Sequence, residues 1–563
     1  MVAITLTKEP SLAKIARILN LISVKHIIMA FKTWTGSDSI VYSNAFNLKK
    51  ARIIAVIVPI ALSACTLGPD FKKPDSPATQ SYILGKTSRQ ISTVSSPSGA
   101  AQTIALGKDI QGQWWTLFRS PALTQLIAKA MQHSPDLQSA LAALNQAEEN
   151  ATAKEGSLFP SLDVNFSHTR QKISGAQFGN PSFPGSKYAL SNASIRVAYT
   201  LDVFGAIRRQ IEGFDAQADY ERAQLEGVFL TLVGNVVTSA IQEASLHAQI
   251  NATQEIINAQ MRQLDLVNRQ FELGGASKLD VLALQSRLEQ IRTTLPPLQQ
   301  QLAQNRHRLT VLAGEMPSTE LSAQFKLADL HLPEQLPLSL PAKLVQQRPD
   351  IQAQEALLHV ASAQIGVATA SLFPDFTINA SVGSVATHIG ELFVPGSAIW
   401  SLGGNILQPV LHGGELSHKR RATLAAYEQA AAQYRSTVLL ALQNVADALS
   451  ALEFDAIALK TQDAAVQVAF DSLELTRHQY RNGAISYVPL LNAERDYQQA
   501  LLGQINAQAR RLADTAALFQ ALGGGWWNRP SLPAVLKTEQ QKTPKNTKDK
   551  LKFLDQLPTI FSP

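Results

Sequence analysis

The side chains that could catalyse a reaction or bind a metal are scattered along this chain of 563 residues. Seven histidines of the main body are scattered without the short spacing of metal ligands: His133, His168, His247, His307, His412, His418 and His478. A Walker-type phosphate loop is also absent from the sequence, because the triple glycine at 523–525 follows a predicted helix instead of opening one. We therefore predict that the protein is not an enzyme and uses neither a metal nor a small-molecule cofactor.

The only cysteine, Cys65, ends a segment with the layout of a secretory signal. The positive stretch Lys49–Arg52 precedes an apolar run, Ile53–Leu62, which is too short to cross a bilayer. The last four residues, Leu62–Cys65, resemble a bacterial lipobox. On that resemblance the signal is cleaved after Ala64, the Cys65 thiol receives S-diacylglycerol and its new amino group is N-acylated, which anchors the chain in a membrane. The alternative is a buried or incidental cysteine.

Three segments flank the main body. Residues 1–64 form a leader with the lipoprotein signal peptide. Because a signal peptide starts near its charges, we expect residues 1–47 to reflect a mis-assigned start, with a genuine extension as the alternative. Residues 65–112 are rich in Pro, Ser, Thr and Gly and predict an extended, lipid-anchored linker. Residues 524–563 are expected to form a disordered basic tail.

The formal net charge of +6 comes from the ends of the chain. Without residues 1–64 the count is 42 Lys and Arg against 42 Asp and Glu. The body between Cys65 and Val535 is mildly acidic and lacks the clustered basic patch of a nucleic-acid surface. We therefore expect no nucleic-acid partner.

The main body contains one structural unit twice. The two units are residues 113–314 and 349–523, and residues 315–348 form an equatorial linker between them. Leu158–Pro160 returns 214 positions later as Leu372–Pro374, and Phe271–Gly274 returns 209 positions later as Tyr480–Gly483. The offset changes by only five, so we interpret this as a duplication of the whole unit. A long period that occurs only twice is not a solenoid.

Each unit begins with a short helix, Pro135–Leu158 or Pro349–Leu372, and continues with two strands. The four predicted strands are 162–167, 195–201, 376–382 and 400–406. Their apolar residues alternate with polar ones, so each strand has one apolar face. This pattern fits a soluble sandwich, and it also fits a membrane barrel whose polar side lines water.

Very long helices follow the strands. Residues 206–272 and 415–481 contain no proline, and 67 residues at ~1.5 Å each give roughly 100 Å of helix. Apolar residues repeat every seven positions in the second of them, as expected for coiled-coil packing: Val438, Leu442, Val445, Leu449, Leu452, Ala456 and Leu459. A return helix follows each one, and Pro296-Pro297 should break the first return helix only.

Four strands cannot close a membrane barrel alone, since about eight are the minimum. Open strand edges are not tolerated in lipid. If these strands lie in a membrane, the chain must therefore form oligomers.

A series of short motifs resembles the outer membrane factor (TolC-like) family, and specifically its NodT-type efflux lipoproteins. The motifs span about residues 60 to 527 and are Leu62–Cys65, Trp114-Trp115, Pro121–Leu123, Pro135–Leu137, Arg348–Ile351, Ala370–Pro374, Gly413-Gly414, Tyr480–Gly483 and Leu490–Arg495. The resemblance implies a mixed α/β membrane protein that forms a homotrimer. Each chain would supply four strands to a twelve-stranded β-barrel, and its antiparallel coiled-coil helices would form a periplasmic tunnel.

The resemblance also implies functional residues. Asp280, Tyr480 and Asn492 match positions of a periplasmic gate, although Asn492 stands where some members carry an aspartate. The tip turns at Gly274, Gly275 and Gly483 would dock an adaptor. The alternatives are a charge favourable at a helix N-terminus for Asp280, helix packing for Tyr480 and a purely turn-forming role for the glycines.

The implied function is a passive exit channel in the cell outer membrane. A periplasmic adaptor and an inner-membrane pump, expected to be of the resistance-nodulation-division type, would deliver small toxic compounds or drugs to it. One alternative is a duct for type I protein secretion. Another, of a different class, is a periplasmic coiled-coil lipoprotein scaffold whose strands form a soluble sandwich.

Overall fold

The computed structural model describes residues 66–79, 81–83, 90–91, 99–174, 176, 179, 182 and 184–529. The chain divides into two compact parts, residues 1–64 and 65–563, and every described residue belongs to the second part. The predicted signal peptide, its cleavage site at Ala64, the lipidation site Cys65 and residues 530–563 of the predicted tail lie outside the described residues.

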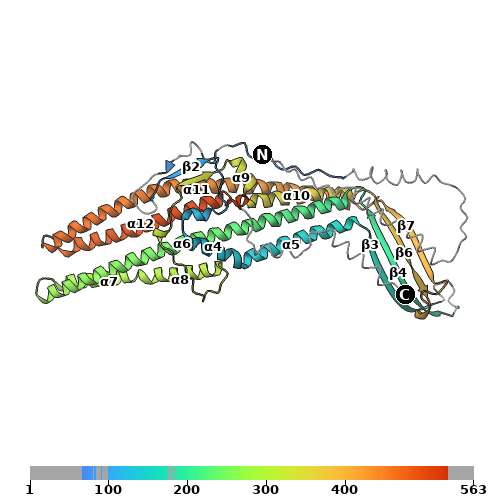
Figure 1. Ribbon diagram of the computed structural model, residues 1–563, viewed down its shortest axis with the longest axis horizontal. Helices are drawn as coiled ribbons and strands as arrows, with labels where there is room; N and C mark the ends of the chain where they lie inside the picture. The colour runs from blue at the N-terminus through green and yellow to red at the C-terminus, as the bar shows by residue number, and fades with distance from the viewer. Residues whose placement is uncertain are drawn as a thin grey trace. The chain divides into compact units, whose positions relative to one another are not determined.

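The helices follow the predicted order (Figure 1). In the described part of the chain the α-helices are α4 (Pro121–His133), α5 (Pro135–Glu155), α6 (Ala206–Glu272), α7 (Lys278–Arg292), α8 (Leu295–Leu312), α9 (Pro341–Gln347), α10 (Pro349–Ala370), α11 (Glu415–Arg481) and α12 (Tyr487–Ala521). Short 3₁₀ helices lie at Trp114–Phe118, Gly156–Leu158, Leu327–Asp329, Ile389–Glu391 and Trp526–Asn528. The bounds of the two 67-residue helices, α6 and α11, agree with the prediction.

The duplication is visible in the packing. Helix α5 contacts α6, α6 contacts α10 and α10 contacts α11, so the two repeats lie side by side (Figure 1). Both short helices, α5 and α10, begin with a proline in their first turn. The predicted break is confirmed: α7 ends at Arg292, and α8 begins with Pro296 in its first turn, whereas α12 runs unbroken.

The four predicted strands form one antiparallel sheet in the order β3-β4-β6-β7. Their bounds are β3 (Ser161–Ile173), β4 (Ser186–Leu201), β6 (Asp375–Ala386) and β7 (Ala398–Leu407), longer than the predicted segments. The pairing of β4 with β6 joins the two repeats into this sheet. The sheet lies at the end of the helices opposite to the turns between α6 and α7 and between α11 and α12 (Figure 1).

A second, small sheet was not predicted. It contains β1 (Gln90–Ile91), β2 (Gln102–Leu106) and β5 (Gln335–Leu338), and β2 pairs in parallel with β5. The linker at 65–112 is therefore bound to the linker at 315–348. The strands are short and β5 contains a proline, so neither linker has the alternation that predicts a strand.

The largest core lies where α4, α6 and α12 meet the Trp114–Phe118 turn. Trp114 is 1% exposed and stacks on Phe519 of α12, with ring centroids 5.3 Å apart. Helices α6 and α11 each contain a stretch whose length and apolar composition would allow a membrane crossing. In α6 most of that stretch is buried inside the protein, as in the core helix of a soluble domain.

Candidate functional site

Each long helix and the helix that follows it form a hairpin, α6–α7 in the first repeat and α11–α12 in the second. The turns at the tips of these two hairpins have the same geometry. Gly274 and Gly483 lie 209 positions apart, and both have the positive φ that favours glycine, +80° and +69°. The amide of Gly274 donates to the Phe271 carbonyl at 3.0 Å, and that of Gly483 donates to the Tyr480 carbonyl at 3.0 Å. Gly275 follows the first turn and donates to the Gln270 carbonyl at 2.7 Å.

Asp280 lies in the first turn of α7 and forms a capping box with the N-cap residue, Ser277. Its amide donates to Ser277 Oγ at 3.1 Å, and its Oδ2 accepts from the Ser277 amide at 3.0 Å, which is a capping box. The alternative of a charge favourable at a helix N-terminus therefore describes its local role. The pKa of Tyr480, on the second hairpin, is raised by burial and secondarily by the charge of Asp280.

Tyr480 and Asn492 lie in different surroundings. The Tyr480 ring packs edge-on against Tyr487, with centroids 5.3 Å apart. Asn492 is exposed on α12. Of the three predicted gate residues, the structure thus brings Asp280 and Tyr480 into one electrostatic neighbourhood and leaves Asn492 on the surface.

The two hairpins are joined near their tips by contacts that the sequence did not predict. A buried apolar cluster contains residues of both hairpins: Val267, Val281, Leu284, Leu473, Tyr487, Leu490 and Ala493. Beside it, Gln260 of α6 donates to Glu494 of α12, and Arg287 of α7 donates to Gln498 of α12 at 3.0 Å. Burial raises the pKa of Glu494, although hydrogen bonding to Gln260 opposes the shift. The seven-residue apolar spacing could indicate coiled-coil packing but not which hairpin is the partner.

The large sheet has one apolar and one polar face. Register places apolar residues of all four strands on one face, including Leu162 opposite Val197, and Val382 opposite Trp400. On the other face, Asp163 lies opposite Arg196. The apolar face is uncovered in the single chain, with side chains 60–77% exposed at Phe166, Leu162, Val164, Ile406, Leu402 and Trp400. A soluble sandwich would bury such a face against a second sheet.

The start of the predicted linker, residues 66–73, is fixed to the helices and is called the strap below. The Leu67 amide donates to the Phe204 carbonyl at 3.2 Å, beside the end of β4. Arg209, whose side chain is 5% exposed, donates to Asp70 at 2.7 Å and to Glu212 at 2.6 Å. The composition of the segment predicted extension, and the structure adds this attachment.

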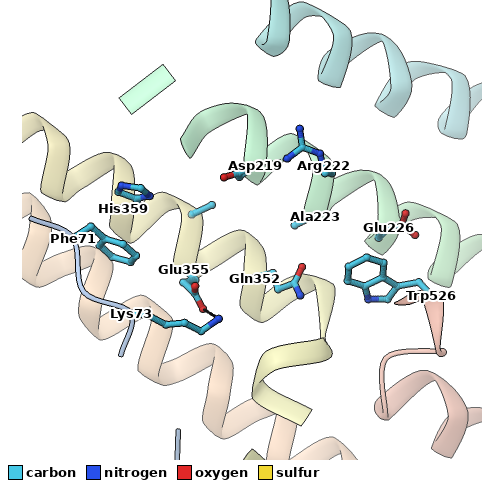
Figure 2. A pocket seen from close by; sticks show the side chains of 11 residues that line it. Phe71, Lys73, Asp219, Arg222, Ala223, Glu226, Gln352, Glu355, His359 and Trp526 are labelled. Atoms are coloured by element: carbon cyan, nitrogen blue, oxygen red, sulfur yellow. Dashed lines mark hydrogen bonds and ion pairs between the residues drawn. The ribbon is translucent and has the colours of Figure 1, made fainter. Parts of the chain in front are cut away.

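Figure 2 shows how the strap continues over α10. Phe71 stacks on His359 with centroids 4.3 Å apart, and Lys73 pairs with Glu355 at 2.9 Å. Both contacts border a cavity of about 260 Å³, which is also lined by Arg222 and Glu226. The cavity wall carries both signs of charge, so it has no clear preference for an anion or a cation. Within the described ranges, no three His, Cys, Asp or Glu side chains come together as metal ligands would.

Comparison with known proteins places the chain in a family. The family described as outer membrane efflux protein matches residues 126–315 and 340–524. The toluene efflux pump outer membrane protein TtgC of Pseudomonas putida is 30% identical over 488 residues, covering 86% of this chain and 97% of TtgC. Nodulation protein T of Rhizobium leguminosarum is 27% identical over 478 residues, covering 84% of this chain and 94% of that protein.

Among solved structures, the outer-membrane channel OprN has a TM-score of 0.72 and 26% identity, covering 82% of this chain and 100% of OprN. The MtrE outer membrane channel of Neisseria gonorrhoeae, solved in its open state, has a similar fold with a TM-score of 0.69 and 24% identity, covering 83% of this chain and 100% of MtrE. The family match falls in two segments, which correspond to the two repeats. The chain belongs to the outer membrane efflux protein family.

Proposed function

We propose that this chain is a passive exit channel in the outer membrane, and that a periplasmic adaptor and an inner-membrane pump supply it with small toxic compounds. The observation that carries the proposal is the open four-stranded sheet with an exposed apolar face and a polar face. Lipid can cover the apolar face, while the polar face can line a water-filled channel. The names of relatives such as the toluene efflux pump protein TtgC support efflux as the process.

A homotrimer would satisfy the edges of this sheet. In the described part of the chain, β3 and β7 each have a neighbour on one side only. Their outer backbone groups would be unpaired in lipid, which is not tolerated. Three copies joined edge to edge give twelve strands and a closed barrel. The two 67-residue helices, each about 100 Å long, would extend from this barrel into the periplasm as a tunnel.

The lipid anchor at Cys65 is part of the proposal. Thr66, the next residue, lies against Gly205, which is located between the end of β4 and the start of α6. A Cβ on Gly205 would be only 2.9 Å from the Thr66 Cα. Thr66 is therefore beside the helix-side end of the large sheet. An S-diacylglycerol and an N-acyl group on Cys65 would then insert next to the barrel. We expect radiolabelled palmitate to enter the protein in growing cells and a Cys65→Ser variant to remain unlabelled. Equal labelling of the two would contradict lipidation at Cys65.

Gate and docking roles for the hairpin tips are also proposed. Asp280 and Tyr480 lie at the contact between the two hairpins, where a change in hairpin spacing would alter an opening. Asn492 is exposed and could face that opening only in the trimer. The turns at Gly274, Gly275 and Gly483 are exposed and could contact an adaptor. We expect the pump to be of the resistance-nodulation-division type.

The uncovered apolar face disfavours the scaffold with a soluble sandwich, and the efflux names of the relatives disfavour protein secretion. Deletion of the gene tests the proposal. We expect the deletion strain to become more susceptible to several toxic compounds, and complementation to restore resistance. Unchanged susceptibility to every compound, in cells that had contained the protein in their outer membrane, would contradict efflux.

A further inference from the structure

Glu243 is a buried carboxyl group without an adequate partner. It lies on α6, and its side chain is 0% exposed. The nearest cationic atoms to its Oε1 are His247 Nε2 at 3.5 Å and Arg306 Nε at 3.9 Å. Among the residues that the structure describes, neither Glu243 oxygen has a hydrogen-bond partner. An ionised carboxylate in such a position is strongly disfavoured.

The surroundings of Glu243 form a small polar site between α6 and α8. Ser239 and His247 lie one turn before and one turn after Glu243, and Ser239 Oγ and His247 Nε2 are likewise buried without a described hydrogen-bond partner. From α8, Asn305 donates to the Ser239 carbonyl at 2.8 Å, and Arg306 faces the carboxyl. Burial, Arg306 and Lys326 all lower the pKa of His247.

The positive charges make a metal ion a poor occupant of this site. Arg306 and Lys326 repel a cation, and only one carboxylate is available to balance it. A proton, with or without a bridging water, neutralises the carboxyl at much lower cost.

The second repeat has a comparable carboxyl group at nearly the same position along its long helix. Asp455 lies 40 positions after Glu415, the first residue of α11, while Glu243 lies 37 positions after Ala206, the first residue of α6. Its Oδ2 is buried without a described hydrogen-bond partner, and its carboxyl group lies against that of Asp514 of α12, with Arg510 and Arg511 of the same helix nearby. The closeness of a second carboxyl group favours the protonated form of Asp455, because two carboxylates cannot both ionise easily so close together.

We propose that Glu243 and Asp455 are buried proton-binding sites, one in each helical hairpin, which make the packing of each long helix on its return helix depend on pH near neutrality. Burial raises the pKa of Glu243 to about 7, and Arg306 only partly opposes it. Burial and then Asp514 raise the pKa of Asp455, against the opposing charges of Arg510 and Arg511. The inference rests on these contacts and does not depend on the proposed transport function.

The sign of the effect follows from linkage. Both folded-state pKa values are raised, so the folded chain binds more protons than the unfolded chain between the ordinary carboxyl range and about pH 7. Stability from these groups is therefore fully present at acidic pH and is lost as the pH rises through this window. Above it, the carboxylates are charged and the α6–α8 and α11–α12 contacts are weakened.

Infrared difference spectroscopy of the full-length protein between pH 5 and pH 9 tests the proposal. We expect the carbonyl band of protonated carboxylic acids to disappear with a midpoint near neutrality. The band should lose one part in Glu243→Gln and another part in Asp455→Asn. Glu255→Gln and Glu453→Gln, at exposed positions of the same two helices, should leave the neutral-range band unchanged.

Thermal unfolding gives a second readout. The melting temperature of the unaltered protein should fall between pH 5 and pH 8, and this slope should be smaller in Glu243→Gln than in Glu255→Gln. No neutral-range carboxyl band in the unaltered protein would overturn the proposal, and this result does not require any variant to fold. A band that both buried-site variants leave intact would overturn it as well.

Discussion

A charge on the apolar face of the large sheet should prevent membrane insertion, whereas the same charge on the polar face should not. Leu402 lies in the middle of β7, is 71% exposed and faces the apolar side together with Val382 and Trp400. Asn405, on the same strand, lies on the opposite face. The matched variants are therefore Leu402→Arg and Asn405→Arg, which introduce the same side chain three residues apart.

The expected magnitude comes from the cost of arginine in a bilayer. An arginine that faces lipid near the midplane of a barrel costs about 2–4 kcal/mol, and one that faces the lumen costs little. At about 1.4 kcal/mol per tenfold change, Leu402→Arg should disfavour insertion by roughly thirtyfold to several hundredfold for each chain. Three chains in a trimer would multiply the effect.

The assay is the amount of heat-stable oligomer in outer-membrane fractions, measured by electrophoresis without boiling. Leu402→Arg should abolish the oligomer band, and Asn405→Arg should keep it near the level of the unaltered protein. Equal amounts of oligomer for the two variants would refute the assignment of the faces. Loss of the band in Asn405→Arg alone would mean that the faces are reversed.

Two further predictions concern the strap and the hairpin tips. A Cβ on Gly68, which has a φ of +94°, would meet the backbone of Gly366 at 2.4 Å, so Gly68→Ala should detach the strap and speed its proteolysis. Gly107→Ala, at a φ of +77° with no atom within 4 Å, is the control, and equal proteolysis of the two would argue against a fixed strap. Leu284→Ala should cost about 2–5 kcal/mol in the fully buried tip cluster and increase conductance across planar bilayers. The 75% exposed Leu279→Ala should change neither, and an unaltered conductance in Leu284→Ala would contradict a role of this cluster in keeping the tips together.

The sequence was most informative where a period extends over many residues. The absence of proline in 206–272 and 415–481 and the glycines that follow them predicted both long helices to the residue. Alternation identified all four strands of the large sheet but underestimated their length. Polar residues continue on both faces near the loops, as at His168–Lys172 in β3, so the apolar signal ends before the hydrogen bonding does.

Contacts between distant segments could not be predicted in the same way. The attachment of the strap depends on single partners such as Arg209 and His359, which have no periodic signal. The contact of Gln260 with Glu494 depends on which hairpin lies beside which, and a heptad pattern does not specify this. The capping box of Asp280 does have a local signal, because a serine lies three residues before it. That signal indicates a helix start, and an acidic residue at a helix start is also compatible with a gate.

Electron cryo-microscopy of the protein extracted from outer membranes tests the central claim most directly. We expect three copies whose β3 and β7 edges pair to close a twelve-stranded barrel, with the apolar face toward the detergent and a continuous polar lumen. A monomer, or an oligomer whose sheets pack face to face without a lumen, would contradict the claim that this chain forms an exit channel.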